Sequence, residues 1–434
     1  LDALVDPALL EYVRSMVENG ISARQPKISA RWRTTPHRSA KDYMKEAYAK
    51  MWKDAHNGRT LLCSAELTTE LEGILAEPMG RVPKQNPDRT MSEEGRFVHD
   101  QRKVNAFGDK HNHPPAIQPR HRELARTILW WKLRVPGIEV HMAKYDVASA
   151  YKLLWLMVRY ACVFATELPG DEVGIDGFVL IISLSLVFGF NGAPGEYMAF
   201  AWVNKMIYQA ATPTQPRWHE SVPFRCKTLM DDQVMVEPAL GVRTHTAAWW
   251  AKEAMRKVFG PKALNMDKLE EEGQFETKKI NWGLGYDTVE ETINLPEPKV
   301  AKIRFLINED AFQYGSVKIP MNLLRSLVGI LIYGTAACPI LWPEMGALYR
   351  LMRGANIGQT NVRVEGDEKE VTQVWAEAWE SFELIRTLVE DPGSWEAGFT
   401  SGLVAVLTTR ERLALPGVMD NLVWTGGDST LITL

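Results

Sequence analysis

The chain alternates between stretches whose apolar residues recur at helical spacing and short apolar runs that are bounded by turn residues. Residues 178–190 and 226–238 are typical of buried strands, and the second range has a polar turn at its centre that predicts a hairpin. Residues 138–151 predict a strand that ends in an aspartate and runs into a helix. Residues 191–210 begin with turn residues and continue as a long helix, and residues 247–260 form an amphipathic helix closed by glycine. This order of elements predicts an α+β fold in which helices cover one face of a sheet.

Two further features lie nearer the N-terminus. Residues 74–84 and 95–105 have strand character, and the polar segment between them predicts a hairpin. Residues 21–59 contain ten Lys and Arg against three acidic residues, interleaved with four aromatic residues: Trp32, Tyr43, Tyr48 and Trp52. Such a mixture suits phosphate contacts and base stacking. The alternative is a solvated helix face whose rings turn inward.

Composition and charge place the chain among globular proteins. Its 434 residues are 46% apolar and 24% charged, which excludes a disordered polyelectrolyte. The formal net charge of -4 argues by itself against a nucleic-acid binder. However, residues 1–140 carry 23 Lys and Arg against 18 acidic residues, whereas the remainder carries 27 against 36. Basic and acidic residues are therefore partly segregated along the chain.

Cysteine usage and apolar stretches bear on the compartment. The four cysteines have no paired spacing, so we expect free thiols in a reducing, intracellular compartment, cytoplasmic or nuclear. The chain opens at Leu1 without a signal peptide, and we expect it to be a fragment. Residues 323–342 are long enough to span a bilayer but contain Arg325 and Pro339, so we expect a buried helix and no membrane partner. The histidines of residues 111–121 lack the spacing of a zinc site and predict a proline-ordered loop.

Three aspartates carry the clearest chemical signal. Asp146 ends one predicted strand, and Asp231 and Asp232 interrupt the apolar hairpin at its turn. Burying adjacent like charges is costly unless a cation holds them. Mg²⁺ bound by a few carboxylates and substrate phosphates meets that need, and two such ions about 3.5–4 Å apart can support phosphoryl transfer. The alternative is an isolated aspartate at a helix start beside an unrelated Asp-Asp turn.

The segments around these aspartates resemble the motifs of reverse transcriptases. In chain order they are RVPK (81–84) with RFVHDQRKVN (96–105), YDVASAY (145–151), FGFNGAPGEYMAF (188–200), LMDD (229–232), LNMDK (264–268) and NWGLGYDT (281–288). Their order and spacing match the family from about residue 74 to residue 300, over half of the chain. The segment from 282 to 303 is similar to the primer grip and thumb start of retrotransposon enzymes, of the LTR type or the tyrosine-recombinase (DIRS-like) type.

The resemblance implies a right-hand polymerase with an antiparallel palm sheet backed by helices. It implies a basic helical extension at 1–59, fingers and palm at 60–290, a thumb at 291–365, and a connection with the start of a ribonuclease H-like domain at 366–434. The C-terminal segment VWTGGDSTLITL is similar to the first strand of that domain, with Asp428 as its first carboxylate. A free tail with a polar turn is the alternative.

The resemblance also assigns residues to roles. Asp146 and Asp231 would bridge two Mg²⁺ ions, or Mn²⁺ instead, with the carbonyl of Val147 completing one shell and Asp232 assisting. The residues expected to bind the nucleotide are Lys84, Arg96, Tyr151, Phe188, Gly189 and Lys268. Those expected to contact template and primer are Gly192, Ala193, Pro194, Leu229, Met230, Trp282 and Gly283. The alternatives are exposed strand charges for Lys84 and Arg96, a solvated Lys268, and core aromatic residues at 151 and 282.

The implied activity is RNA-directed DNA polymerisation, with an RNA template, a DNA or RNA primer and dNTPs as partners. Leu229 departs from the Tyr or Phe that the family usually has beside the Asp pair, and Phe188 matches retrotransposon enzymes where retroviral ones have Gln. Two alternatives stay open. An RNA-dependent RNA polymerase shares the aspartates, although Tyr151 argues against ribonucleotides; a decayed or domesticated copy would bind nucleic acid without extending it. The oligomeric state does not follow from the sequence.

Overall fold

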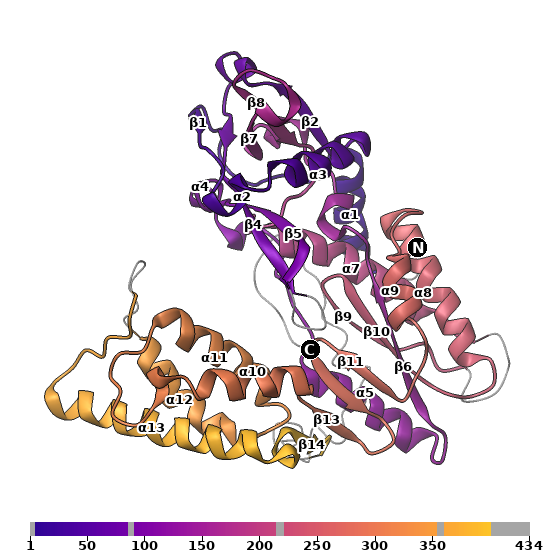
Figure 1. Ribbon diagram of the computed structural model, residues 1–434. Coiled ribbons are helices and arrows are strands. Elements are labelled where there is room, and N and C mark those ends of the chain that lie inside the picture. Colours follow the sequence, from indigo (N-terminus) through magenta and orange to yellow (C-terminus); the bar gives the residue numbers. More distant parts are fainter. Residues whose placement is uncertain (1–4, 86–90, 214–220, 354–359, 401–434) are drawn as a thin grey trace.

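The computed structural model describes residues 5–85, 91–213, 221–353 and 360–400. Figure 1 shows three regions: sheet and helices at the top, a central sheet flanked by helices, and a bundle of helices at the lower left. The mixture of helices and strands confirms the predicted α+β class. The proposed ribonuclease H-like strand with Asp428 lies outside the described residues.

The top region is built on a five-stranded mixed sheet. Its strands, in spatial order, are β1 (Trp32–Arg33), β3 (Leu75–Ala76), β7 (Ala165–Pro169), β8 (Phe178–Ser183) and β2 (Thr60–Ser64). Helices α2 (Arg38–Lys41) and α3 (Met44–His56) contribute Ala40, Met44 and Met51 to a core with Val179 and Ile181. The segment before residue 60 therefore shares a sheet and a core with the segment after it. The predicted domain boundary at residue 59 falls inside this packed unit.

The N-terminal helix α1 (Pro7–Asn19) packs against α7 (Ala193–Ala210), with its apolar face in the core. Asp6 caps the helix by accepting a hydrogen bond from the backbone N–H of Leu9 at 3.0 Å, and proline begins the first turn. The aromatic residues of the basic segment were expected either to be available for base stacking or to turn inward. Tyr48 is buried, whereas Trp32, Tyr43 and Trp52 are exposed.

The predicted upstream hairpin is confirmed. Strands β4 (Met79–Gln85) and β5 (Met91–His99) pair antiparallel, with Val82 opposite Arg96. The predicted second strand extended to residue 105, but the chain turns after His99 into the short helix α4 (Arg102–Ala106). Asp100 stops the strand because its carboxylate accepts hydrogen bonds from the backbone N–H and the side chain of Arg102.

The central sheet holds the three aspartates. Strand β10 (Asp232–Pro238) lies between β6 (Val140–Asp146) and β9 (Cys226–Leu229), and both pairings are antiparallel. Helices α5 (His121–Arg134), α7 and α8 (Arg243–Phe259) pack against these strands. Trp131 of α5 anchors the sheet from one side by donating its indole N–H to the carbonyl of Val236 at 2.8 Å. The predicted helix after β6 is only a 3₁₀ turn, because Ser149 adopts a left-handed backbone with φ of 61°.

A second antiparallel sheet links this region to the bundle. Its strands are β11 (Lys278–Asn281), β12 (Leu284–Asp287), β13 (Thr292–Asn294) and β14 (Glu396–Gly398). The bundle contains α10 (Glu297–Ile307), α11 (Met321–Gly334), α12 (Leu341–Met352) and α13 (Glu368–Glu390). One apolar core joins all four helices, with Ile303, Leu327, Leu348 and Phe382 fully buried in it. The predicted boundary after residue 365 therefore separates α13 from the helices with which it packs.

The remaining elements are short. They are α6 (Val158–Ala161), α9 (Met266–Glu272) and the 3₁₀ turns η1 (Ala65–Thr69), η2 (Lys110–Asn112), η3 (Ala150–Leu153), η4 (Asp171–Val173), η5 (Asp310–Phe312) and η6 (Pro392–Trp395). Within the described ranges, no helix is long and apolar enough to cross a membrane. The stretch 323–342, expected to be one buried helix, is divided between α11 and α12, and one face of each helix lies in the core. All four cysteines are free thiols.

Candidate active site

The register of the central sheet brings the three aspartates together. Asp232, the first residue of β10, pairs directly with Asp146, the last residue of β6. Residues paired across neighbouring strands project their side chains from the same face. Asp231 lies in the two-residue turn of the hairpin, where Met230 has a positive φ of 53°. The carbonyl of Asp231 accepts a hydrogen bond from the backbone N–H of Val147 at 3.0 Å, which ties the turn to the end of β6.

The environment of Asp231 and Asp232 opposes the ionisation of their carboxyl groups. Burial raises the pKa of Asp231, and the charge of Asp146 adds to the effect. The pKa of Asp232 is raised to about 6, chiefly by burial and in part by the charges of Asp231 and Asp146, while Lys144 and Lys268 oppose the shift. Among the described residues, the buried Oδ1 atom of Asp232 has no hydrogen-bond partner. The site therefore holds more negative charge than its own neighbours neutralise.

Helix α9 supplies the side chains that do contact Asp146. Asn265, the N-cap of α9, donates its side-chain amide to Oδ2 of Asp146 at 2.9 Å, and Lys268 Nζ donates to Oδ1 at 2.5 Å. Burial lowers the pKa of Lys268, but the bond to Asp146 and the three aspartate charges raise it more, so the net shift is upward. The structure thus places Lys268 with the aspartates, as predicted. Asn265 was missed, although it lies in the same LNMDK segment.

An aromatic wall borders the aspartates on another side. Tyr151 is 8% exposed, and its ring lies 4.7 Å from that of Phe188 and 5.5 Å from that of Tyr197, measured between centroids. Burial raises the pKa of Tyr151 to about 12, and the Asp231 charge contributes, so the phenol lies within the field of the site. Phe188 covers Tyr151 from the outside and is 48% exposed.

Gly189, predicted at the nucleotide site, and Gly192, predicted to contact template and primer, lie where a side chain would not fit. Gly189 has φ of +94°, and a Cβ there would come within 2.7 Å of the carbonyl oxygen of His99. A Cβ on Gly192 would lie 2.5 Å from the ring of His113. Ala193 and Pro194 begin helix α7 directly afterwards. The loop 188–192 is therefore packed closely onto the chain around residues 99–113.

The hairpin of β4 and β5 carries the two predicted triphosphate contacts. Arg96 is exposed, and its positive charge lowers the pKa of Asp231, so it lies within electrostatic reach of the aspartates. Lys84 lies in β4, but its side chain is outside the described part of the structure. The structure therefore relates Arg96 to the site and leaves the role of Lys84 as a prediction.

The residues predicted to contact template and primer occupy two hairpin turns. Leu229 and Met230 are half-buried beside Asp231. Trp282 and Gly283 form the turn between β11 and β12, with φ of 51° and 86°. Trp282 is 8% exposed and packs near the ring of His121 in the core. That placement of Trp282 matches the alternative of a core aromatic residue. The carbonyl of Gly283 accepts a hydrogen bond from Lys299 Nζ at 2.7 Å.

The donor set fits a hard divalent cation. Carboxylate oxygens are the ligands that Mg²⁺ prefers, and the partnerless oxygen of Asp232 and the raised pKa values call for added positive charge. As the side chains lie, no group of three or more His, Cys, Asp and Glu residues in the described ranges is gathered closely enough to hold an ion. The carboxylate of Asp146 already has a positive partner, because the ammonium group of Lys268 contacts it.

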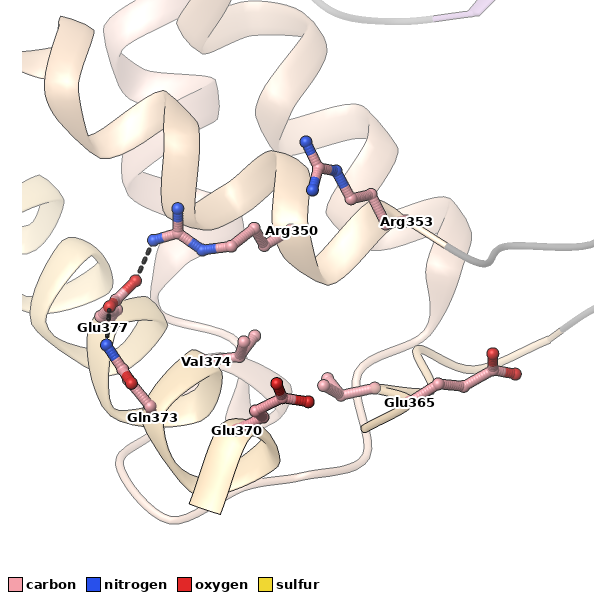
Figure 2. A pocket seen from close by; sticks show the side chains of 8 residues that line it. Arg350, Arg353, Glu365, Glu370, Gln373, Val374 and Glu377 are labelled. Atoms are coloured by element: carbon pink, nitrogen blue, oxygen red, sulfur yellow. Dashed lines mark hydrogen bonds and ion pairs between the residues drawn. The ribbon is translucent and has the colours of Figure 1, made fainter. Parts of the chain in front are cut away.

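A separate cavity of about 530 Å³ lies between α12 and α13, as Figure 2 shows. Charged residues of both signs line it: Arg350, Arg353, Glu365, Glu370 and Glu377. Arg350 forms an ion pair with Glu377 across this cavity. None of the residues predicted for the active site lines it, so its position does not bear on the aspartates.

Comparison with known proteins gives a likeness of fold. No protein-family model matches the sequence, and neither does any curated protein sequence. Two solved structures of the foamy viral protease-reverse transcriptase in complex with double-stranded DNA are similar. The dRH form is 14% identical with a TM-score of 0.47, over 83% of this chain and 50% of that chain. The other is 14% identical with a TM-score of 0.48, over 82% of this chain and 60% of that one.

The chain therefore spans only half to three-fifths of the length of those two proteins. The similarity concerns a fold like that of a reverse transcriptase. At this level of similarity, the chemistry of the site has to follow from its own residues.

Proposed function

We propose that this chain is a template-directed nucleotidyltransferase and, more specifically, an RNA-directed DNA polymerase of a retrotransposon. The observation that carries the proposal is the register of β6 and β10, which places Asp146 opposite Asp232 with Asp231 in the adjoining turn. Holding three carboxylates together away from water costs folding free energy, so such a group points to a function that offsets the cost. The retrotransposon origin is supported by the sequence motifs alone.

Two Mg²⁺ ions would be held by Asp146, Asp231 and the carbonyl of Val147, with Asp232 nearby. When bound, these ions would supply electrostatic stabilisation of the attacking and leaving oxygens in phosphoryl transfer. The overall reaction joins the primer 3′-oxygen to the α-phosphorus of a dNTP, breaks the bond to the leaving pyrophosphate, and releases the hydroxyl proton. An RNA template would select the dNTP by base pairing.

The protein side chains would position the reactants. Arg96 can bind the triphosphate through paired N–H donors, a geometry that suits phosphate oxygens. Lys268 is kept protonated by the aspartates and has a proton to donate to the leaving pyrophosphate. Tyr151, held under Phe188 beside Asp231, would leave no room for a 2′-hydroxyl on the incoming sugar.

The Tyr151–Phe188 pair, whose rings are tilted at 60° to each other, favours a DNA polymerase over an RNA-dependent RNA polymerase. The other alternative is a decayed copy that binds nucleic acid without extending it. The departure at Leu229 supports that alternative, whereas the retention of all three aspartates in register argues against it.

A primer-extension assay on an RNA template tests the proposal. We expect incorporation of dNTPs that requires Mg²⁺ and is abolished by Asp231→Asn, which removes one bridging ligand. The matched control is Asp176→Asn, the same change at an exposed aspartate of the top region, which should leave extension intact. Absence of extension by the wild-type protein, with duplex binding retained, would instead support the decayed copy. Extension that survives Asp231→Asn would refute the assignment of the site.

A further inference from the structure

Asn105, the last residue of the RFVHDQRKVN segment, bonds the loop 188–192, whose Phe190 is itself buried in the core. The side-chain amide of Asn105, on helix α4, donates a hydrogen bond from Nδ2 to the carbonyl of Gly189 at 2.8 Å. Its Oδ1 atom accepts a hydrogen bond from the backbone N–H of Asn191 at 2.9 Å. One planar amide therefore satisfies a backbone acceptor and a backbone donor two residues apart, as the peptide group of a neighbouring strand would.

Asn105 is itself fixed to the hairpin of β4 and β5. Its backbone N–H donates to the carbonyl of Gln101 at 2.8 Å, and helix α4 begins three residues after the end of β5. Gly189 packs on the same stretch of chain, since a Cβ there would lie 2.7 Å from the carbonyl oxygen of His99. The loop and the hairpin thus meet at Asn105.

The loop carries Phe188, the residue that covers Tyr151. Their ring centroids are 4.7 Å apart, and Phe188 is 48% exposed, so little else confines its outer side. Glycine follows directly at position 189 and again at 192, and glycine gives a backbone many accessible conformations. Phe190 is anchored by its buried ring, so the bonds from Asn105 matter most for the Gly189 peptide that precedes it. Without these bonds that peptide could rotate, and Phe188 would be held less firmly over Tyr151.

We propose that Asn105 is a positioning residue that fixes the Phe188–Tyr151 pair and thereby sets the discrimination between deoxyribonucleotides and ribonucleotides. This inference rests on the proposed function. It has two separable parts. The first is that Asn105 rigidifies the loop, and the second is that the rigid loop is needed for sugar selection.

The first part is tested without catalysis, by hydrogen–deuterium exchange of a peptide covering the loop. In Asn105→Ala, the N–H of Asn191 loses its acceptor, and we expect its exchange to accelerate at least tenfold. Asn105→Asp keeps an acceptor for that N–H but sets a carboxylate against the Gly189 carbonyl, so a smaller acceleration is expected. The matched control is Asn112→Ala, which alters an exposed asparagine of the same segment and should leave the loop unchanged. Unchanged exchange in Asn105→Ala would overturn the proposal.

The second part is tested by single-nucleotide extension with matched dNTP and rNTP. We expect Asn105→Ala to reduce the ratio of their kcat/KM values about tenfold, equivalent to about 1.4 kcal/mol. The change should come mainly from a lower KM for the rNTP, and it should vanish in a Tyr151→Val background. A loop that loosens while the ratio stays constant would overturn the role in selection. If the wild-type protein extends no primer and binds no nucleotide, the proposed function fails and selection fails with it, whereas the exchange result still decides the first part.

Discussion

The two ends of strand β10 carry two different kinds of buried carboxylate. Near the C-terminal end, Glu237 is fully buried and bonded to Arg243 Nε at 2.6 Å and to the backbone N–H of Arg225 at 2.6 Å. At the N-terminal end, Asp232 pairs with another carboxylate, and one of its oxygens has no partner among the described residues. Both have raised pKa values, about 7 for Glu237 and about 6 for Asp232, in each case chiefly through burial.

The difference lies in where the counter-charge comes from. Arg243 is itself completely buried, and its guanidinium carbon lies 4.5 Å from the ring centroid of Trp131 and 5.1 Å from that of Phe224. The fold thus places a permanent cation, the guanidinium group of Arg243, beside Glu237. Among the described residues, Lys268, Arg96 and Lys144 lower the pKa values of Asp231 or Asp232, but both values stay raised, which favours an added cation. The fold itself supplies the counter-charge of Glu237, whereas for Asp232 we propose a bound cation.

The largest effect should come from breaking the internal pair. Arg243→Met leaves Glu237 buried without its cation, which typically costs about 3–5 kcal/mol of unfolding free energy. The loss should be greater at pH 8 than at pH 6. Glu237 has a folded-state pKa raised above its unfolded value, so its proton is retained at low pH and stability falls as pH rises through about 7. Urea unfolding at the two pH values measures this.

The double variant Glu237→Gln/Arg243→Met serves as the control for that prediction. It removes the stranded charge, so it should recover much of the lost stability and flatten the pH dependence. A double variant as unstable as Arg243→Met would mean that the cost comes from packing around the guanidinium and not from the buried carboxylate.

A tyrosine beside each carboxylate allows the second comparison. Tyr151 lies near Asp231, and Tyr208 donates its hydroxyl to Glu237 at 3.3 Å. We expect Tyr151→Val to raise rNTP incorporation by a few hundredfold while dNTP incorporation persists, since a steric clash of about 3–4 kcal/mol is removed. Tyr208→Phe, at the structural end, should leave the dNTP/rNTP ratio unchanged. Parallel single-nucleotide extension measures both, and a constant ratio in Tyr151→Val would remove the steric gate.

The sequence was most informative where local chemistry decides the structure. Strands β6, β9 and β10 follow from short apolar runs, and the turn at Asp231 follows from polar residues between two of them. The grouping of the aspartates needed one more fact, that β6 lies beside β10. Strand pairing between segments about eighty residues apart is not encoded in periodicity, and the family motifs supplied it before the structure did.

What the sequence could not reveal depends on long-range packing. Asn105 makes two side-chain hydrogen bonds to a segment far along the chain, and Asn265 makes one to Asp146, and no periodic pattern marks either residue. The burial of Trp282 was similarly hidden, because an aromatic residue in a polar hairpin turn can face either way until its core neighbours are known. The boundaries at 59 and 365 came from composition and resemblance, whereas the sheet and the bundle are defined by contacts.

The third prediction concerns Arg96 of β5, whose charge lowers the pKa of Asp231. Arg96→Ala should weaken dNTP binding about ten- to hundredfold, because a hydrogen bond to a charged group contributes about 1.5–3 kcal/mol. Binding of the template–primer duplex should change much less. Titrating each ligand separately measures this, with Arg159→Ala, an exposed arginine on α6, as the control. Equal losses for both ligands would place Arg96 on the duplex and not on the triphosphate.

The smallest effect, and the one that most directly separates the two ends of β10, concerns Asp232 without metal. Asp232→Asn should raise the unfolding free energy at pH 8 by about 1–2 kcal/mol, a value discounted for partial solvent screening. The sign follows from linkage. The folded-state pKa of Asp232 is raised from 3.8 to about 6, so the wild-type protein loses stability as pH rises through this window, and the variant does not. The gain should therefore be largest above pH 6 and shrink as pH falls toward 4.

Thermal unfolding in metal-free buffer at several pH values measures this gain, with Asp176→Asn as the exposed control that should show none. With Mg²⁺ added, the wild-type protein should become more stable than Asp232→Asn. An ion that binds only the folded wild-type site stabilises that state by RT ln(1 + [Mg²⁺]/Kd). Glu237→Gln should respond to neither the removal nor the addition of Mg²⁺, since Arg243 already fills the place of the cation. If Asp232→Asn instead lowers stability in metal-free buffer, then Lys144 and Lys268 neutralise the aspartates as fully as Arg243 neutralises Glu237. In that case the two ends of the strand are alike, and the electrostatic case for a metal site is lost.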